Sequence, residues 1–151
     1  MRIERKEFDS KSQLIREVLA DGSSTTYMYN SAGLLVEETT HPDENAENQS
    51  RTRDLTPRTV TREYDGSGRV VGLTNLEGIV ERSRYDAANN LVYWEVQGTQ
   101  NLADGRADPV RITEYKYDLS NRMTEQTNQD RAVSAEYDKS GNVIRVVTSL
   151  Y

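Results

Sequence analysis

Residues 64–86 read YDGSGRVVGLTNLEGIVERSRYD, and this stretch decides the fold of the chain. It begins with a Tyr-Asp pair, places Gly68 four residues after the tyrosine, and continues through two short β-prone segments that flank Glu77-Gly78. Aspartate at the head of a tight turn accepts hydrogen bonds from backbone N–H groups, and glycine closes such a turn at positive φ. Because Tyr85-Asp86 starts the same pattern again, the stretch predicts a β-hairpin unit that repeats.

The same unit recurs along the whole chain, and short intervals of about 21 residues alternate with long ones of about 33. Self-similarity at this period is typical of repeat architectures. The six pairs that start the units are Phe8-Asp9, Tyr29-Asn30, Tyr64-Asp65, Tyr85-Asp86, Tyr117-Asp118 and Tyr137-Asp138. The residues four positions after the aromatics are Ser12, Gly33, Gly68, Asn89, Asn121 and Gly141, and all but the first are Gly or Asn.

The segments between the turns are short and rich in β-branched and aromatic residues. Residues 14–19 (LIREVL), 91–96 (LVYWEV) and 111–117 (RITEYKY) are examples. Such segments between turn signals predict strands. We therefore expect an all-β protein, a single array over residues 1–151 of about six repeats and about twelve strands that are joined as consecutive antiparallel hairpins.

Two polar insertions account for the long intervals. They are residues 41–57 (HPDENAENQSRTRDLTP) and 98–111 (GTQNLADGRADPVR). Each replaces the second turn of a unit, so we expect both to leave the sheet at the same edge. They are interpreted as surface loops, and contact loops for a partner are the alternative.

Composition excludes several classes of function. The net charge of −6 argues against a nucleic-acid binder, and the absence of cysteine excludes disulfides and thiolate metal sites. There is no apolar run long enough for a membrane helix, so membrane insertion is not expected. The first residues also lack the apolar core of a secretion signal.

No constellation of residues indicates catalysis, a cofactor or a metal. The one histidine, His41, is followed by Asp43 and Glu44, but a solvated loop residue is the favoured interpretation. The repeated aspartates occupy equivalent turn positions, whereas an acid–base pair needs two carboxyls in one pocket. Residues 103–109 (ADGRADP) lack the ligand spacing of an EF-hand.

Exposed aromatic residues are the candidates for contact with a glycan or a protein partner. They are Tyr93, Trp94 and Tyr115. Tyr115 and Tyr117 share one face of a strand, and Trp94 lies on the opposite face from Tyr93. Tyrosines on one face, such as Tyr115 and Tyr117, form a tyrosine ladder, and packing between layers is its favoured interpretation.

The repeated unit resembles the YD-repeat, or RHS-repeat, family, whose usual form is Tyr-Asp, two variable residues, Gly-Arg-Leu, a spacer with glycine and a return to tyrosine. Residues 64–86 are the best copy, whereas Ser12 and Asn89 replace the turn glycine and Asn30 replaces the aspartate. The resemblance implies a curved, spiralling sheet of the kind that forms a β-shell around a toxic polypeptide in bacteria, or an extracellular barrel in teneurin-like animal proteins. It also implies an exported or cell-surface protein.

Two functions follow from these observations. The first is a non-catalytic structural module whose partners are the rest of a longer RHS-type chain or its cargo polypeptide. The second is a module that binds a glycan or a protein through the aromatic residues and the two long loops. The chain begins and stops within hairpins, so copies are expected to pair through strand edges.

Overall fold

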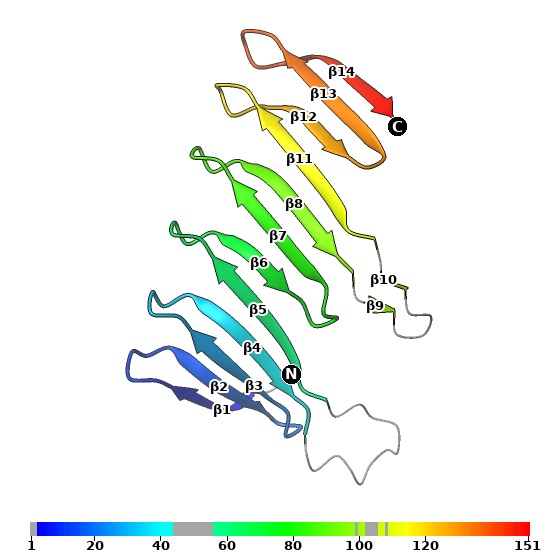
Figure 1. Cartoon of the computed structure of the whole chain (residues 1–151). Coiled ribbons are helices and arrows are strands. Elements are labelled where there is room, and N and C mark those ends of the chain that lie inside the picture. Colours follow the sequence, from blue (N-terminus) through cyan, green and yellow to red (C-terminus); the bar gives the residue numbers. More distant parts are fainter. Residues whose placement is uncertain (1–2, 44–55, 99, 102–105, 108) are drawn as a thin grey trace. The chain divides into compact units, whose positions relative to one another are not determined.

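The computed structural model describes residues 3–43, 56–98, 100–101, 106–107 and 109–151, and these residues form strands and turns without any helix (Figure 1). The prediction of an all-β, antiparallel hairpin protein is confirmed. Twelve strands have five to eight residues, and two have only two residues each. The strands are β1 (Ile3–Phe8), β2 (Leu14–Leu19), β3 (Ser24–Tyr29), β4 (Leu35–His41), β5 (Arg58–Tyr64), β6 (Val70–Thr74), β7 (Val80–Tyr85), β8 (Leu91–Gln97), β9 (Gln100–Asn101), β10 (Arg106–Ala107), β11 (Arg111–Tyr117), β12 (Met123–Asn128), β13 (Arg131–Tyr137) and β14 (Val143–Leu150).

The chain forms two compact units, residues 1–77 and 78–151. In the first, strands β1 to β6 pair with their chain neighbours, and every pairing is antiparallel. In the second, β7, β8, β11, β12, β13 and β14 pair in the same way. Each connection therefore joins adjacent strands, as the hairpin pattern of the sequence predicts.

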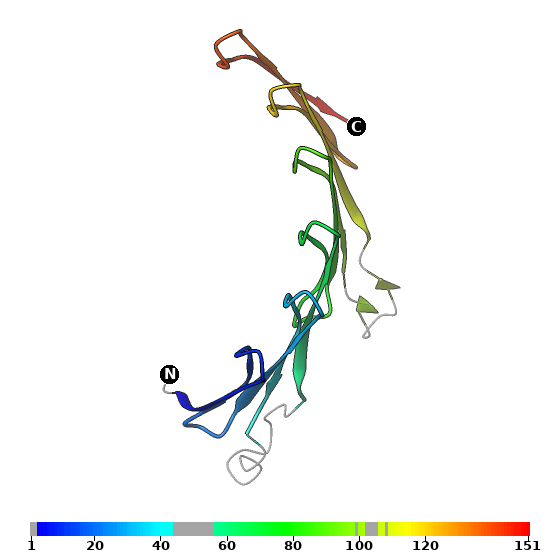
Figure 2. The same ribbon diagram turned by 90° about the vertical axis from the view of Figure 1, so that its left-hand side faces the viewer.

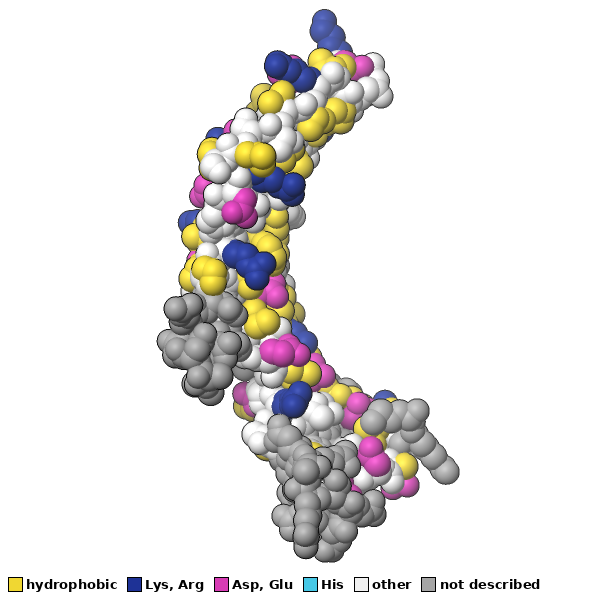
Figure 3. All heavy atoms as spheres, turned by 90° about the vertical axis from the view of Figure 1, so that its right-hand side faces the viewer, with side chains coloured by type: hydrophobic (Ala, Val, Ile, Leu, Met, Phe, Trp, Pro, Cys, Tyr) yellow, Lys and Arg dark blue, Asp and Glu magenta, His cyan; other side chains and the backbone are white. Residues whose placement is uncertain are grey.

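Each unit is a sheet one layer thick (Figure 2). No large side chain of the described residues is fully buried, and hydrophobic side chains lie at the surface beside charged ones (Figure 3). The residues that are buried and polar are Ser23, Ser24, Thr39 and Thr113. The tyrosines therefore do not pack between two layers, which corrects the interpretation of the ladder. A single layer cannot enclose a hydrophobic core, so backbone pairing and side-chain contacts between neighbouring strands hold each sheet together.

The two insertions differ in what the structure describes. Strand β4 ends at His41 and β5 begins at Arg58, and residues 44–55 of the first insertion lie outside the described residues. His41 belongs to a strand and is half-buried, so its interpretation as a solvated loop residue is wrong. In the second insertion, β9 and β10 pair as a short antiparallel ladder where the sequence predicts only a loop.

The six aromatic-led turns share one backbone geometry. In each, the residue after the aromatic makes two backbone hydrogen bonds. Its N–H donates to the carbonyl of the residue four positions further along, and its carbonyl accepts from the N–H of the residue three positions further along. The pairing register shifts at the aromatic, as expected for a three-residue hairpin loop with a bulge. The fourth residue after the aromatic has positive φ in all six: Ser12 (64°), Gly33 (82°), Gly68 (78°), Asn89 (68°), Asn121 (58°) and Gly141 (88°).

Replacement of Gly68 by alanine should lower the free energy of unfolding by about 1–2 kcal/mol, because an L side chain at positive φ is strained. A Cβ at Gly68 would meet only Leu34 Cδ1, at 3.8 Å, so crowding contributes little. Gly66→Ala is the matched control: its Cβ would meet no atom within 4 Å and its φ is not positive. Urea denaturation measures both variants, and equal effects would contradict the turn geometry.

Candidate functional site

The first oxygen of the turn aspartate organises the loop. In residues 65–69, Asp65 Oδ1 accepts hydrogen bonds from the backbone N–H of Ser67 (2.9 Å) and of Arg69 (3.1 Å). The same two bonds occur in the five other turns, with Asp9, Asn30, Asp86, Asp118 and Asp138 as acceptors. Asn30 serves as well as aspartate because its amide oxygen takes the place of the carboxylate oxygen.

The second oxygen of the aspartate binds the side chain that follows the positive-φ residue. The Nε atoms of Arg69 and Arg122 lie 2.7 Å from Oδ2 of Asp65 and Asp118. Asn142 Nδ2 donates to Asp138 Oδ2 at 2.9 Å.

These contacts lower the pKa values of three turn carboxyls below their usual value of 3.8. The hydrogen bond from the Arg69 backbone is the largest cause for Asp65, and the Arg122 side chain is the largest cause for Asp118. The Asn142 side chain has the same role for Asp138. Hydrogen bonds to the charged form favour that form. The turns therefore hold these carboxyls as anions.

The same following side chain also reaches the next turn within its unit. Gln13 Nε2 donates to the Gly33 carbonyl oxygen at 3.3 Å. Arg122 Nη1 donates to the Asp138 carbonyl oxygen at 3.2 Å, and its guanidinium lies 4.6 Å from the centre of the Tyr137 ring. The Arg122 side chain thus binds both its own turn and the neighbouring one.

The repeat tyrosines connect successive hairpins through their hydroxyl groups. The Tyr64 hydroxyl donates to the Leu35 carbonyl oxygen at 2.7 Å, and Leu35 is the first residue of β4. Tyr29, Tyr117 and Tyr137 donate in the same way to the first residues of β2, β8 and β12, which are Leu14 (2.9 Å), Leu91 (2.9 Å) and Met123 (2.7 Å). We call this contact the tyrosine clasp. Tyr85 occupies the same hairpin position, whereas Phe8 lacks a hydroxyl and is 56 % exposed.

Sequence reasoning finds the tyrosines but misses the clasp. The constant spacing from each aromatic to the first residue of the following strand is the signal that was available. It could not identify the acceptor, because the carbonyl belongs to the preceding hairpin, which lies from 14 to 29 residues earlier in the chain.

A separate polar network lies on the first unit. The Tyr27 hydroxyl donates to Glu17 Oε1 at 2.9 Å, and Arg62 Nη2 binds Glu38 Oε2 at 3.2 Å. Burial, followed by the hydrogen bond to Glu17, raises the pKa of Tyr27 to about 12. The tyrosine stays neutral in the physiological range, so it acts there as a hydrogen-bond donor and not as a base.

The three candidate contact aromatics do not form one surface. Trp94 pairs with Thr113 and Tyr93 with Glu114, so the two rings lie on opposite faces of the sheet. Trp94 Nε1 donates to Glu81 Oε2 at 3.1 Å, and the Arg84 guanidinium lies 3.9 Å from the centre of the Tyr93 ring. One face of Tyr93 is therefore covered. Tyr115 lies with Tyr117 at an open cavity of about 650 Å³.

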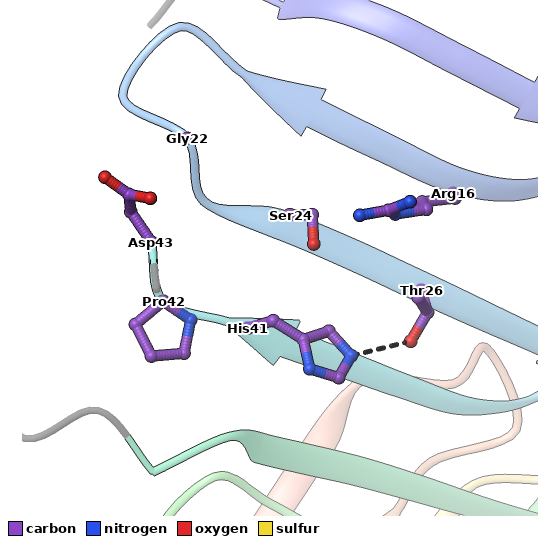
Figure 4. Close-up of a pocket in the computed structure, with 7 residues that line it drawn as sticks. All are labelled: Arg16, Gly22, Ser24, Thr26, His41, Pro42 and Asp43. Atoms are coloured by element: carbon purple, nitrogen blue, oxygen red, sulfur yellow. Dashed lines mark hydrogen bonds between the residues drawn. The ribbon is translucent and has the colours of Figure 1, made fainter. Parts of the chain in front are cut away.

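His41 lines a second cavity, of about 490 Å³, on the first unit (Figure 4). Its Nε2 lies 3.1 Å from Thr26 Oγ1, and the other lining residues include Arg16, Ser24 and Asp43. Within the described residues, no group of three histidine, cysteine or carboxylate side chains could hold a metal ion. Most of residues 103–109, the segment that lacks the ligand spacing of an EF-hand, lies outside the described residues.

The model of the RHS Repeat family matches residues 8–46, which hold the Phe8-Asp9 and Tyr29-Asn30 turns. This segment is similar to an RHS repeat. The four other turns repeat its backbone hydrogen bonds, although they lie beyond the RHS match. No curated protein matches the chain. Among the described residues, none lies in a helix long and apolar enough to cross a membrane.

Solved structures with a similar course of the chain are parts of much larger proteins. The crystal structure of TcdB2-TccC3-Cdc42 is 16% identical over 97% of this chain, with a TM-score of 0.48, and that of TcdB2-TccC3 is 17% identical over 97%, with a TM-score of 0.49. A Photorhabdus luminescens Tc holotoxin pore is 18% identical over 91%, with a TM-score of 0.43. The chain spans only 8–9% of the length of these proteins.

Removal of the Tyr64 hydroxyl (Tyr64→Phe) should lower the free energy of unfolding by about 0.5–1.5 kcal/mol, because the Leu35 carbonyl loses its donor. Tyr115→Phe is the control, since the Tyr115 hydroxyl makes no hydrogen bond within the described part of the chain. Urea denaturation compares the two. Equal losses would show that the ring alone, without its hydroxyl, connects the hairpins.

Acid should destabilise the protein through the turn carboxyls. Their lowered pKa values mean that the stabilisation is complete above the usual pKa of 3.8 and is lost as the pH falls through the lowered values. Thermal melts should show a falling Tm below about pH 4. The triple variant Asp65→Asn, Asp118→Asn, Asp138→Asn keeps the Oδ1 acceptor and should flatten this dependence, whereas Asp130→Asn should not. An unchanged acid slope in the triple variant would contradict the assignment.

Proposed function

We propose that the chain is a non-catalytic structural section of an RHS-type wall that encloses a polypeptide. The observation that supports this best is the lateral connection of hairpins in a single layer. Backbone pairing, the turn contacts and the tyrosine clasp all act between neighbouring hairpins within each unit. A sheet built in this way extends by adding hairpins and needs no core of its own, as in other repeat proteins.

The polar groups of the repeated unit make hydrogen bonds within the fold, and this supports a non-catalytic role. Asp65 and Asp118 each use both carboxylate oxygens within their own turn. Their lowered pKa values keep them ionised at neutral pH, whereas a general acid needs a raised value. The clasp tyrosines likewise donate their hydroxyl protons to backbone carbonyls.

The proposed partners are the remainder of a longer RHS-type chain and its cargo polypeptide. This fits the match of residues 8–46 to the RHS repeat. Export or display at the cell surface accompanies this role. Copies of the chain can also pair through strand edges, because β14 is exposed along its length and carries Ile144 and Val146.

Binding of a glycan or protein by Tyr93, Trp94 and Tyr115 is less well supported than the role as a section of a wall. Tyr93 lies on the opposite face from Trp94, and its ring is covered by Arg84. The three rings therefore offer no common platform for stacking.

The proposed role as part of an enclosing wall can be tested by measuring protease protection in the product of the full reading frame. We expect a segment outside residues 1–151 to resist protease in the intact protein. The double variant Tyr64→Ala, Tyr117→Ala removes one clasp from each unit and should expose that segment to cleavage, because the wall opens where hairpins separate. Tyr115→Ala is the matched control and should preserve protection. A protein without a protected segment, or with protection that is indifferent to the clasps, would reject encapsulation.

A further inference from the structure

The outer edge of β14 is left open by the hairpin pairings of the second unit. Within the described residues, β14 is hydrogen-bonded to β13 alone, and all eight of its residues are exposed (Figure 1). Ile144, Val146 and Leu150 are 63 %, 60 % and 80 % exposed. A long, apolar edge strand is a template for pairing with another strand.

The register with β13 decides which backbone groups of β14 face the open edge. The Tyr151 N–H donates to the Asp130 carbonyl oxygen at 3.1 Å, and Val147 lies opposite Ser134 four residues further along the same ladder. Hydrogen-bonded and non-hydrogen-bonded pairs alternate in an antiparallel ladder, so the odd-numbered residues of β14 bond to β13. The residues that direct their N–H and C=O groups outward are Ile144, Val146, Thr148 and Leu150.

Charge distinguishes this edge from the outer edge of β1 in the first unit. Residues 4–7 of β1 are all charged, and Arg5 binds Glu7 at 3.1 Å. Charged side chains on an edge strand oppose pairing with another strand. β14 carries one charged side chain, Arg145, which is bound to Glu136 of β13 at 3.2 Å. A strand with equally few charges suits this edge, and β14 of a second copy is such a strand.

One antiparallel register of β14 with itself satisfies every outward backbone group. When the Val147 residues of two copies lie opposite each other, Ile144 is opposite Leu150 of the second copy, and Val146 is opposite Thr148 of the second copy. Each of these pairs joins two outward residues, so each exchanges two backbone hydrogen bonds. A shift by one residue would oppose outward residues to inward ones. A shift by two would leave one outward residue of each copy without a mate.

The side chains agree with this register. Val146 and Thr148 lie on the face that carries Ala135 and Val133 of β13, so the apolar side chains of both copies continue one face. Cross-strand pairs of apolar and β-branched residues stabilise a sheet, whereas like charges directly opposite each other destabilise it. Arg145 lies opposite Ser149 of the second copy, and no like charges meet.

We propose that β14 joins two copies of this chain into a two-fold symmetric dimer. The sheets of the two second units form one continuous sheet, with the symmetry axis between the two Val147 residues. The same surface is used on both copies, so the contact closes and assembly stops at two chains. This inference rests on the edge pairing in the proposed function and assigns its edge, symmetry and register.

Disulfide cross-linking of the 151-residue chain tests the register, because the chain has no cysteine of its own. Val147→Cys brings two thiols together at a non-hydrogen-bonded pair, whose Cα separation of about 4.5 Å a disulfide can span. Mild oxidation should convert most of this variant into a covalent dimer. Ser149→Cys is the matched control: it shares the strand and face of Val147 but lies opposite Arg145 of the second copy, so it should stay largely uncross-linked.

Light scattering tests the assembly without a cross-link. The unmodified chain should have twice the mass of a single chain at high concentration. Val146→Pro removes an outward N–H and leaves the hydrogen bonds to β13 intact, so it should give the mass of one chain. Val146→Thr keeps that N–H and a β-branched side chain, and should preserve the dimer. Far-UV circular dichroism of each variant separates loss of pairing from loss of folding.

Three results would overturn the proposal. They are the mass of one chain at every concentration, equal cross-linking of Val147→Cys and Ser149→Cys, and open-ended assemblies larger than a dimer. The third would indicate that β14 pairs with β1 of the next copy. The protease experiment on the wall uses the product of the full reading frame, so either proposal can fail without the other.

Discussion

The hydrogen bond from a tyrosine hydroxyl to the first carbonyl of the preceding hairpin's second strand is the contact on which the repeat depends. A single layer has no interior, so neighbouring hairpins are held by their backbone pairing and by whatever side chains cross between them. The tyrosine supplies both a large ring and a directed donor at one position. Tyr64 and Tyr117 show the same contact in the two units.

This contact works only because the turn places the ring correctly. The three-residue loop shifts the register at the aromatic, and the positive φ of the fourth residue closes the loop. The aspartate fixes that loop by accepting hydrogen bonds from two backbone N–H groups. An arginine or asparagine side chain adds a hydrogen bond to its own turn or to the next one. The hydrogen bonds that fix each turn therefore also help to hold neighbouring hairpins together, which suits a structural role better than a catalytic one.

The sequence was a good guide to local structure and a poor one to sites. Strands β2 and β11 coincide with residues 14–19 and 111–117, because β-branched runs between turn residues have few alternatives. His41 was misplaced, because its strand pairing with Ser24 rests on register across a hairpin. The cavity beside it also went unseen, since Arg16, Ser24 and His41 meet only through that register.

The sequence by itself determined the hairpin unit, its turns and its resemblance to the RHS repeat, since spacing and φ preference are local properties of the chain. The tertiary structure decided that the tyrosines clasp backbone within a single layer instead of packing between layers. It also decided that Tyr93 and Trp94 are separated by the sheet and that Ser24 and His41 line one cavity. These outcomes depend on which strands become neighbours, and no single segment encodes that.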